Sequence, residues 1–113
     1  MLLKDIIKIL DAEVITQNIQ EDLDIHSACG SDLMSDVLAY VKDQGILLTG
    51  LVNSQVVRTA EMMDIRAIIF VRGKRPEQEV IELAQEHDMQ LLCTPLHMFS
   101  ACGKLYEAGL GKK

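Results

Sequence analysis

A repeated passage from a short apolar run, through a small polar turn, into a helical pattern constrains the fold of this chain most. It occurs in three stretches, ILLTGLVNSQVVRTAEMM, AIIFVRGKRPEQEVIELA and LLCTPLHMFSACGKLY. Short buried strands that alternate with helices are typical of a parallel sheet covered by helices. The sequence therefore predicts an α/β fold, with a mixed, mostly parallel sheet of four to five strands and helices on both faces. Any ligand of such a sheet is expected at the turns that follow the strands.

The spacing of apolar residues predicts a first helix over residues 3–10 and several short strands. The expected strands are 13–17, 25–29, 46–48, 67–71 and 90–93. The alternating pattern of the segment 13–17 favours a place at the edge of the sheet. The unbroken apolar run at 46–48 is typical of a central strand that is covered on both faces.

Cap residues mark the second and third helices. Ser31 and Asp32 are expected to form a turn and an N-cap, and Gly45 is expected to close the second helix. Either Asn53 or Ser54 can cap the third helix.

Prolines mark the last two helices. Pro76 is expected at the first helical position, and Thr94 with Pro95 repeats the signal of a cap followed by a proline. The last helix is expected to end at Gly109. Inward-facing side chains are expected at Leu33, Met34, Val37, Leu38 and Val41, at Val56, Val57, Ala60 and Met63, at Val80, Ile81 and Ala84, and at Phe99, Cys102, Leu105 and Tyr106.

Length and charge narrow the class of protein. With 113 residues, of which 49% are hydrophobic, the chain can build one core, and we expect a single domain over residues 1–113. The net charge of −6 argues against a nucleic-acid binder, because such affinity comes from clustered Lys and Arg. The one internal basic cluster, Arg72, Lys74 and Arg75, is small and most simply a solvated loop.

The first residues and the cysteines predict the cellular compartment of the protein. Charges interrupt the apolar stretch within residues 1–14, which therefore resembles neither a signal peptide nor a membrane span. Cys29, Cys93 and Cys102 are odd in number and form no close pair, so we expect reduced thiols in the cytoplasm. Small apolar packing is their expected role, and a lowered thiol pKa stays an alternative at Cys29, just before a helix.

Few residues carry a chemical signature. His26, His87 and His97 lie too far apart for a metal motif, and no cofactor motif is present. The segment 49–53 lacks the glycine spacing and the lysine of a phosphate loop. Cys93 and His97 could meet in space, but the sequence shows neither an orienting partner nor an oxyanion site for them. We therefore expect no catalytic residues, no metal and no cofactor.

The strand-end turns hold the candidate ligand-binding residues, because helix N-termini there present unpaired N–H groups that attract anions. These candidates are Ser31, Asp32, Thr49, Gly50, Asn53, Arg72, Gly73 and Thr94. Each of them also has an ordinary capping or turn role in any α/β domain.

Three longer strings carry a family resemblance. ACGSDLMSDVLAY, LLTGLVNSQVVRTAEMMDIRAIIFVRGK and MFSACGKLYEAGL resemble the DRTGG domain. Candidates for the dispersed residues that its letters name are Asp36, Thr49, Gly50, Arg58, Thr59 and Gly73. The resemblance implies a fold similar to the N-terminal domain of HPr kinase/phosphorylase. Such modules also occur in phosphate acetyltransferases and in pyrophosphatases with CBS domains, where they are accessory, regulatory or dimer-forming parts.

Two hypotheses for function follow. The first is a stand-alone regulatory or protein-interaction module without catalytic activity of its own, expected to form a homodimer or to bind a separately encoded enzyme or signalling protein. Methionines such as Met34, Met62 and Met98 could serve an adaptable contact surface or fill the core. The alternative is a small-ligand sensor that binds a nucleotide or a phosphorylated metabolite at the strand-end turns. Neither nucleic acid nor a membrane is expected as a partner.

Overall fold

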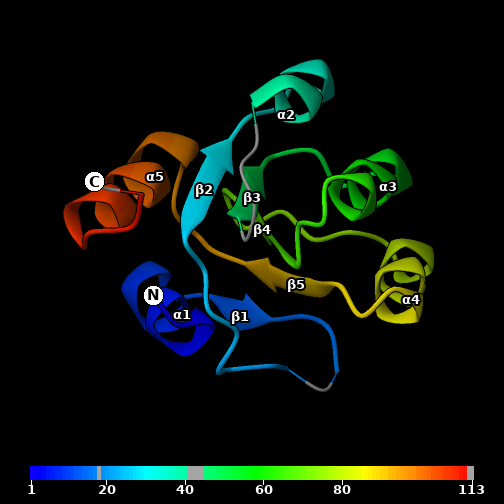
Figure 1. The fold of residues 1–113 in the computed structure, drawn as a ribbon. Coiled ribbons are helices and arrows are strands. Elements are labelled where there is room, and N and C mark those ends of the chain that lie inside the picture. Colours follow the sequence, from blue (N-terminus) through cyan, green and yellow to red (C-terminus); the bar gives the residue numbers. More distant parts are fainter. Residues whose placement is uncertain (18, 41–44, 112–113) are drawn as a thin grey trace.

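A computed structural model describes residues 1–17, 19–40 and 45–111 of the chain (Figure 1). They form a five-stranded sheet in the order β1-β5-β4-β3-β2, in which β1 is antiparallel to β5 and the other neighbours are parallel. The strands are β1 (Glu13–Val14), β2 (Ser27–Gly30), β3 (Gly45–Thr49), β4 (Ala67–Phe70) and β5 (Gln90–Cys93). The helices are α1 (Leu3–Leu10), α2 (Met34–Tyr40), α3 (Ser54–Met62), α4 (Gln78–Glu86) and α5 (Met98–Glu107).

Helices cover both faces of the sheet. Helices α1 and α5 lie on one face, and α2, α3 and α4 lie on the other (Figure 1). Alternate residues of β3 enter two separate core clusters, because successive side chains of a strand point to opposite faces. Ile46 and Leu48 join the cluster under α1 and α5, whereas Leu47 joins the cluster under α2, α3 and α4. The fold class predicted from the sequence is therefore confirmed.

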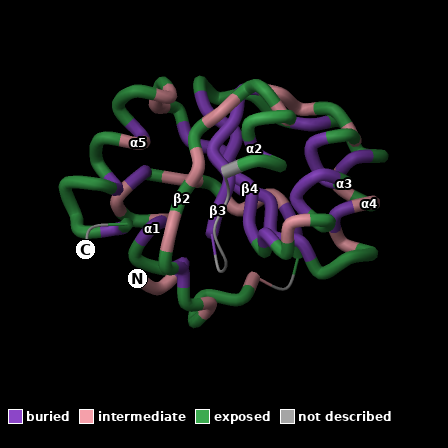
Figure 2. The backbone as a smooth tube through the Cα atoms, turned by 45° about the horizontal axis from the view of Figure 1, so that its top comes forward, coloured by how far each residue is buried: buried purple, intermediate pink, exposed green. Residues whose placement is uncertain are grey.

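The register aligns the ends of the parallel strands. Thr49 is opposite Phe70, and Phe70 is opposite Cys93, so the turns that follow β3, β4 and β5 share one edge of the sheet. Strand β2 lies at the outer side of the sheet, with half-buried and exposed residues in alternation, whereas β3 and β4 are buried throughout (Figure 2). In the described part of the chain, the sheet thus has one edge formed by strand ends and an open lateral edge along β2.

Several predicted boundaries are confirmed. The first helix spans Leu3–Leu10, the last strand spans Gln90–Cys93, and the expected edge strand pairs at the outer side of the sheet, although regular pairing there covers only Glu13–Val14. Asn53, rather than Ser54, caps α3, because its side chain accepts a hydrogen bond from the Val56 N–H at 3.2 Å. The strand expected at 25–29 begins two residues later than predicted and covers Ser27–Gly30.

Three predicted helix signals are wrong. Gly45 is the first residue of β3 and does not close α2, which ends at Tyr40. Helix α4 begins at Gln78, so Pro76 precedes the helix instead of occupying its first position. Helix α5 begins at Met98, and Thr94 with Pro95 belongs to the turn before it. The predicted closing glycine of α5 is confirmed, because Ala108 is the C-cap after Glu107 and Gly109 follows it with a positive φ of 108°.

The predicted inner faces of the second and last helices are also wrong in part. Val37 is buried, but Leu33 and Leu38 are exposed, and Val41 lies outside the described residues. In α5 the buried residues are Ala101 and Leu105, whereas Phe99 and Tyr106 are exposed. The physical reason is that each short helix contacts the sheet through a narrower stripe than its apolar residues could cover.

Candidate functional site

Asp32 connects two strand ends of the sheet. Its Oδ1 accepts a hydrogen bond from the Thr49 hydroxyl at 3.0 Å and another from the Gly50 N–H at 2.7 Å. Thr49 Oγ1 in turn accepts the Leu51 N–H at 3.1 Å. Asp32 therefore does not serve as the predicted cap of α2. It holds the turn after β2 against the end of β3, and hydrogen bonds to a carboxylate are among the stronger ones in proteins.

Arg72 lies over the same strand end. A Cβ placed on Gly50 would be 2.7 Å from Nη2 of Arg72 and 3.5 Å from each carboxylate oxygen of Asp32. A glycine at position 50 therefore lets the guanidinium and the carboxylate come close to the backbone. Among the described residues, the Arg72 guanidinium has neither a hydrogen bond nor an ion pair. It is an exposed cation.

The loop after β4 has a fixed backbone. Arg72 has a positive φ of 60°, which is uncommon for a residue other than glycine. Its N–H donates to the Leu96 carbonyl at 2.8 Å, and the Gly73 N–H donates to the Thr94 carbonyl at 2.8 Å. These two bonds anchor the loop on the turn after β5. The guanidinium therefore projects from a backbone that the neighbouring turn restrains.

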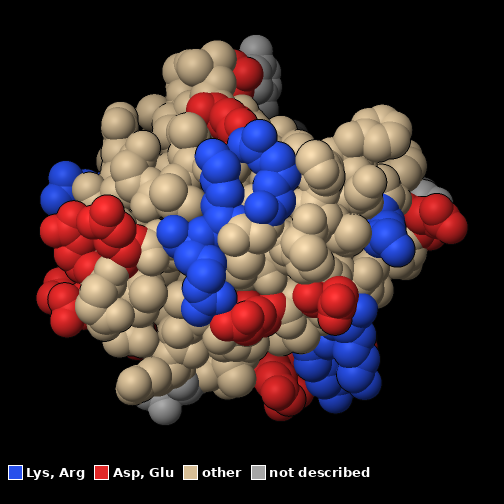
Figure 3. Space-filling view, turned by 180° about the vertical axis from the view of Figure 1, so that it is seen from behind, with Lys and Arg blue, Asp and Glu red and all other residues tan. Residues whose placement is uncertain are grey.

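A shallow pocket of about 460 Å³ adjoins this cluster at the start of α3. Gly50, Asn53 and Ser54 line it on one side, and Lys74, Glu77 and Glu79 contribute charges. Figure 3 shows Lys and Arg side chains gathered on one face of the molecule with Asp and Glu side chains on either side. The mixed charge would favour a small anion held by a specific contact over a long polyanion.

The other candidate residues serve the fold. The Thr94 hydroxyl is fully buried, where it donates to the Leu10 carbonyl at 2.6 Å and accepts the Leu96 N–H at 3.3 Å. Ser31 Oγ accepts the Leu33 N–H at 3.0 Å within a local turn. The structure thus brings Asp32, Thr49, Gly50 and Arg72 together in what we call the strand-end cluster. Ser31, Gly73 and Thr94 shape the turns around it.

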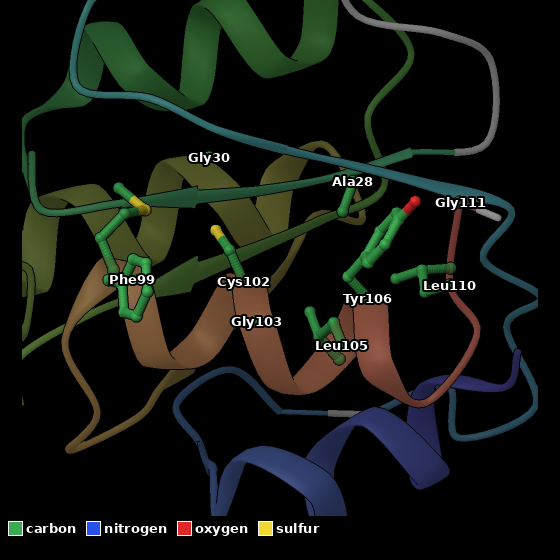
Figure 4. Close-up of a pocket in the computed structure, with 10 residues that line it drawn as sticks. Ala28, Gly30, Phe99, Cys102, Gly103, Leu105, Tyr106, Leu110 and Gly111 are labelled. Atoms are coloured by element: carbon green, nitrogen blue, oxygen red, sulfur yellow. The ribbon is translucent and has the colours of Figure 1, made fainter.

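The structure shows a second region that the sequence analysis missed. A groove of about 610 Å³ lies between β2 and α5, and it is lined mostly by apolar side chains (Figure 4). Its walls include Ala28 and Gly30 from the strand and Phe99, Cys102 and Tyr106 from the helix. The sequence signal was the presence of two apolar stripes on α5, of which only the one with Ala101 and Leu105 packs inward.

Burial shifts the pKa values of the three thiols. Desolvation raises the pKa values of Cys29, Cys93 and Cys102 above their ordinary value. The alternative of a lowered thiol pKa at Cys29 is therefore wrong. Among residues 1–17, 19–40 and 45–111, no group of three His, Cys, Asp or Glu side chains could hold a metal ion. In the same part of the chain, no helix has the length and apolar character that a membrane crossing needs.

Comparison with protein families decides the classification. The family model of the DRTGG domain matches residues 5–108. The chain belongs to the DRTGG domain family. Of the candidates for the family's named residues, Thr49 and Gly50 lie in the strand-end cluster, while Arg58 and Thr59 lie on α3.

A solved structure shares the fold of this DRTGG domain. It contains the CBS and DRTGG domains of the regulatory region of the Clostridium perfringens pyrophosphatase, complexed with the activator diadenosine tetraphosphate. The TM-score is 0.76 at 17% sequence identity, over 97% of this chain and 48% of the other. This chain therefore spans about half the length of that structure. No curated protein matches the sequence.

Proposed function

We propose that this DRTGG domain is a regulatory module that acts by binding protein chains, first of all a second copy of itself, and that it catalyses no reaction. The observation that carries the proposal is the exposed apolar surface beside the open edge of the sheet. Phe99 is 89% exposed and Tyr106 is 61% exposed, and both line the groove next to β2. Exposed apolar patches next to grooves are typical of protein interaction sites.

The family and the chemistry of the chain support this proposal. In the Clostridium perfringens pyrophosphatase, a DRTGG domain is part of a regulatory region, which fits a role as an accessory of an enzyme or a signalling protein. Burial raises the pKa values of the three thiols of this chain, so the thiolate form, which is the nucleophile, is rarer than for an exposed thiol at neutral pH. A binding role agrees with both observations.

Sedimentation equilibrium of the full chain tests self-association. We expect the average mass to rise from monomer to dimer as the protein concentration increases through the micromolar range. A mass that stays monomeric at the highest attainable concentration would contradict the proposed homodimer.

A second candidate function is the sensing of a small phosphorylated ligand. The observation in its favour is the Arg72 guanidinium, which has no partner among the described residues and lies beside the Gly50 backbone. An arginine fork of this kind suits a phosphate oxygen pair. The solved structure of the clostridial regulatory region was complexed with a nucleotide activator, which gives a reason to test nucleotides first.

A thermal-shift screen with pyrophosphate, acetyl phosphate, coenzyme A and adenine nucleotides tests the sensor. A ligand at a hundredfold excess over its Kd should stabilise the domain by about 2.7 kcal/mol. The variant Arg72→Ala should lose this gain, whereas Arg66→Ala, an exposed arginine just before the opposite end of β4, should keep it. The absence of a shift with every compound would contradict the sensor.

A further inference from the structure

We propose that the second copy docks at the open edge of the sheet, with the two α5 helices crossing antiparallel at Gly103 and with Phe99 of each copy seated in the groove of the other. This inference rests on the proposed self-association and specifies its surface. It follows from the distribution of exposed apolar side chains, from the sequence of α5 and from one glycine.

The large exposed apolar side chains cluster around β2. Those of the described residues are Leu33 at 57%, Leu38 at 45%, Met62 at 73%, Phe99 at 89% and Tyr106 at 61% exposure. Four of these five belong to α5 or to α2 and the residue before it, and Figure 1 shows these two helices on either side of β2. The open edge is therefore flanked by apolar side chains on both faces of the sheet.

Helix α5 has a second apolar stripe on its outer side. Phe99, Gly103 and Tyr106 follow the spacing of neighbours on one face of a helix, whereas Cys102 packs against the core beside Gly30. The inner stripe with Ala101 and Leu105 already packs on the sheet. A helix with apolar residues on two sides is typically buried on two sides. We therefore expect a partner chain to bury the exposed side chains of this outer stripe.

Gly103 is the least explained residue of that stripe. Glycine weakens the interior of a helix relative to alanine. A Cβ on Gly103 would meet no atom within 4 Å, whereas a Cβ on Gly30 would be 2.6 Å from Cys102 Sγ. The fold of one copy thus disfavours a Cβ at position 30 but not at position 103. A backbone from another chain that approaches α5 closely would require it.

The face is complementary to itself, which favours a second copy as the occupant. Phe99 lies four residues before Gly103 and Tyr106 lies three residues after it. In an antiparallel crossing at Gly103, Phe99 of one copy would therefore meet Tyr106 of the second copy, and the reverse contact would form by symmetry. The protruding Phe99 and the groove beside Tyr106 lie on the same surface (Figure 4). Such a surface can pair with itself around a two-fold axis.

The lateral edge of the sheet extends the same surface. Strand β2 has β3 on one side and no strand on its other side among the described residues. An extended peptide would cover this strand but would leave the apolar side chains of α2 and α5 exposed. A second sheet edge with the same flanking helices would cover the strand and both helices together. The geometry thus favours another copy of the chain over a peptide.

Sedimentation equilibrium of full-length variants tests the surface. Phe99→Glu should raise the dimer Kd by about 30-fold or more, the effect of losing an aromatic anchor at the centre of an interface. Met62→Glu is the matched control, because Met62 is similarly exposed but lies on α3, and its Kd should stay unchanged. A dimer that resists Phe99→Glu, or that dissociates only with Met62→Glu, would overturn the inference and leave self-association intact.

Cross-linking provides a second readout that does not depend on weakening the dimer. Gly103→Cys in a Cys102→Ser background should form a disulfide-linked dimer under mild oxidation, because the two residues at position 103 meet at the two-fold axis. The background Cys102→Ser alone should stay uncross-linked. A Gly103→Cys variant that still sediments as a dimer but does not cross-link would contradict the crossing at Gly103. A wild-type chain that stays monomeric would contradict the inference and the proposed self-association together.

Discussion

The strand-end cluster and the open edge of the sheet differ in how many of their polar groups are bonded and how many of their apolar side chains are buried within one copy of the chain. At the strand ends, Asp32 binds Thr49 and Gly50 through hydrogen bonds, and only the Arg72 guanidinium lacks a partner among the described residues. At the open edge, four large apolar side chains stay exposed around a strand without an outer neighbour in the described part of the chain. Most polar groups of the first region are therefore bonded within one copy, whereas a partner chain would bury apolar surface in the second region.

The largest effect is expected where the strand-end cluster is broken from within. Asp32→Ala removes the acceptor of two hydrogen bonds, one of them from a buried threonine, and should lower the free energy of unfolding by about 2 kcal/mol. Asp22→Ala, at an exposed turn, is the matched control and should change it by less than about 0.5 kcal/mol. Urea unfolding measures both, and equal effects would show that Asp32 does not tie the strand ends together.

Two glycines of the open edge should respond in opposite directions. Gly30→Ala forces a Cβ against Cys102 Sγ and should destabilise the fold by about 1–2 kcal/mol. Gly103→Ala meets open space and should stabilise the monomer by about 0.5–1 kcal/mol through helix propensity.

The same Gly103→Ala variant should weaken self-association, because its methyl group separates the two helices. Urea unfolding at low protein concentration and sedimentation at high concentration measure the two effects separately. A variant that becomes more stable and associates as well as the wild type would remove Gly103 from the interface.

The smallest effect concerns the thiols of the two regions. Burial raises the pKa values of Cys29, Cys93 and Cys102, so each thiolate is rarer in the folded chain than in the unfolded one. Alkylation by iodoacetamide at neutral pH should therefore be slower for the native chain than for the chain in urea.

The pH dependence of stability follows with a definite sign. The unfolded thiols lose their protons first as the pH rises, so this contribution to stability is present at neutral pH and is lost above the ordinary thiol pKa. Native alkylation that is as fast as in urea would contradict the burial of these thiols.

The sequence predicted the central architecture because its signals there agree with one another. The unbroken apolar run at Ile46–Leu48, the following Thr49–Gly50 turn and the cap at Asn53 all specify a buried strand followed by a helix. Local propensity and burial pattern point to the same element, and the structure confirms it.

The candidate site was predictable in location but not in its contacts. The end of each strand could be read from the chain, so Thr49 and Arg72 were placed at one edge of the sheet. The bond from Thr49 to Asp32 joins residues 17 positions apart and depends on the pairing of β2 with β3, which no local pattern encodes.

The predicted inner face of α5 is wrong in part for a related reason. Phe99 and Tyr106 were assigned to the core, since an apolar stripe on a helix does not say whether it faces its own sheet or another chain. The inner stripe through Ala101 and Leu105 has the same period, so periodicity alone could not decide between the two. Only the packing of α5 on β2 distinguishes them.

Hydrogen exchange measured by mass spectrometry at low and high protein concentration compares the two regions in one experiment. We expect peptides that cover 27–30 and 98–107 to become more protected as the concentration rises, because a second copy covers β2 and α5. Peptides that cover 49–54 and 72–75 should exchange at the same rate at both concentrations. Added protection only at the strand-end turns, or none in either region, would contradict the open edge as the surface where two copies meet.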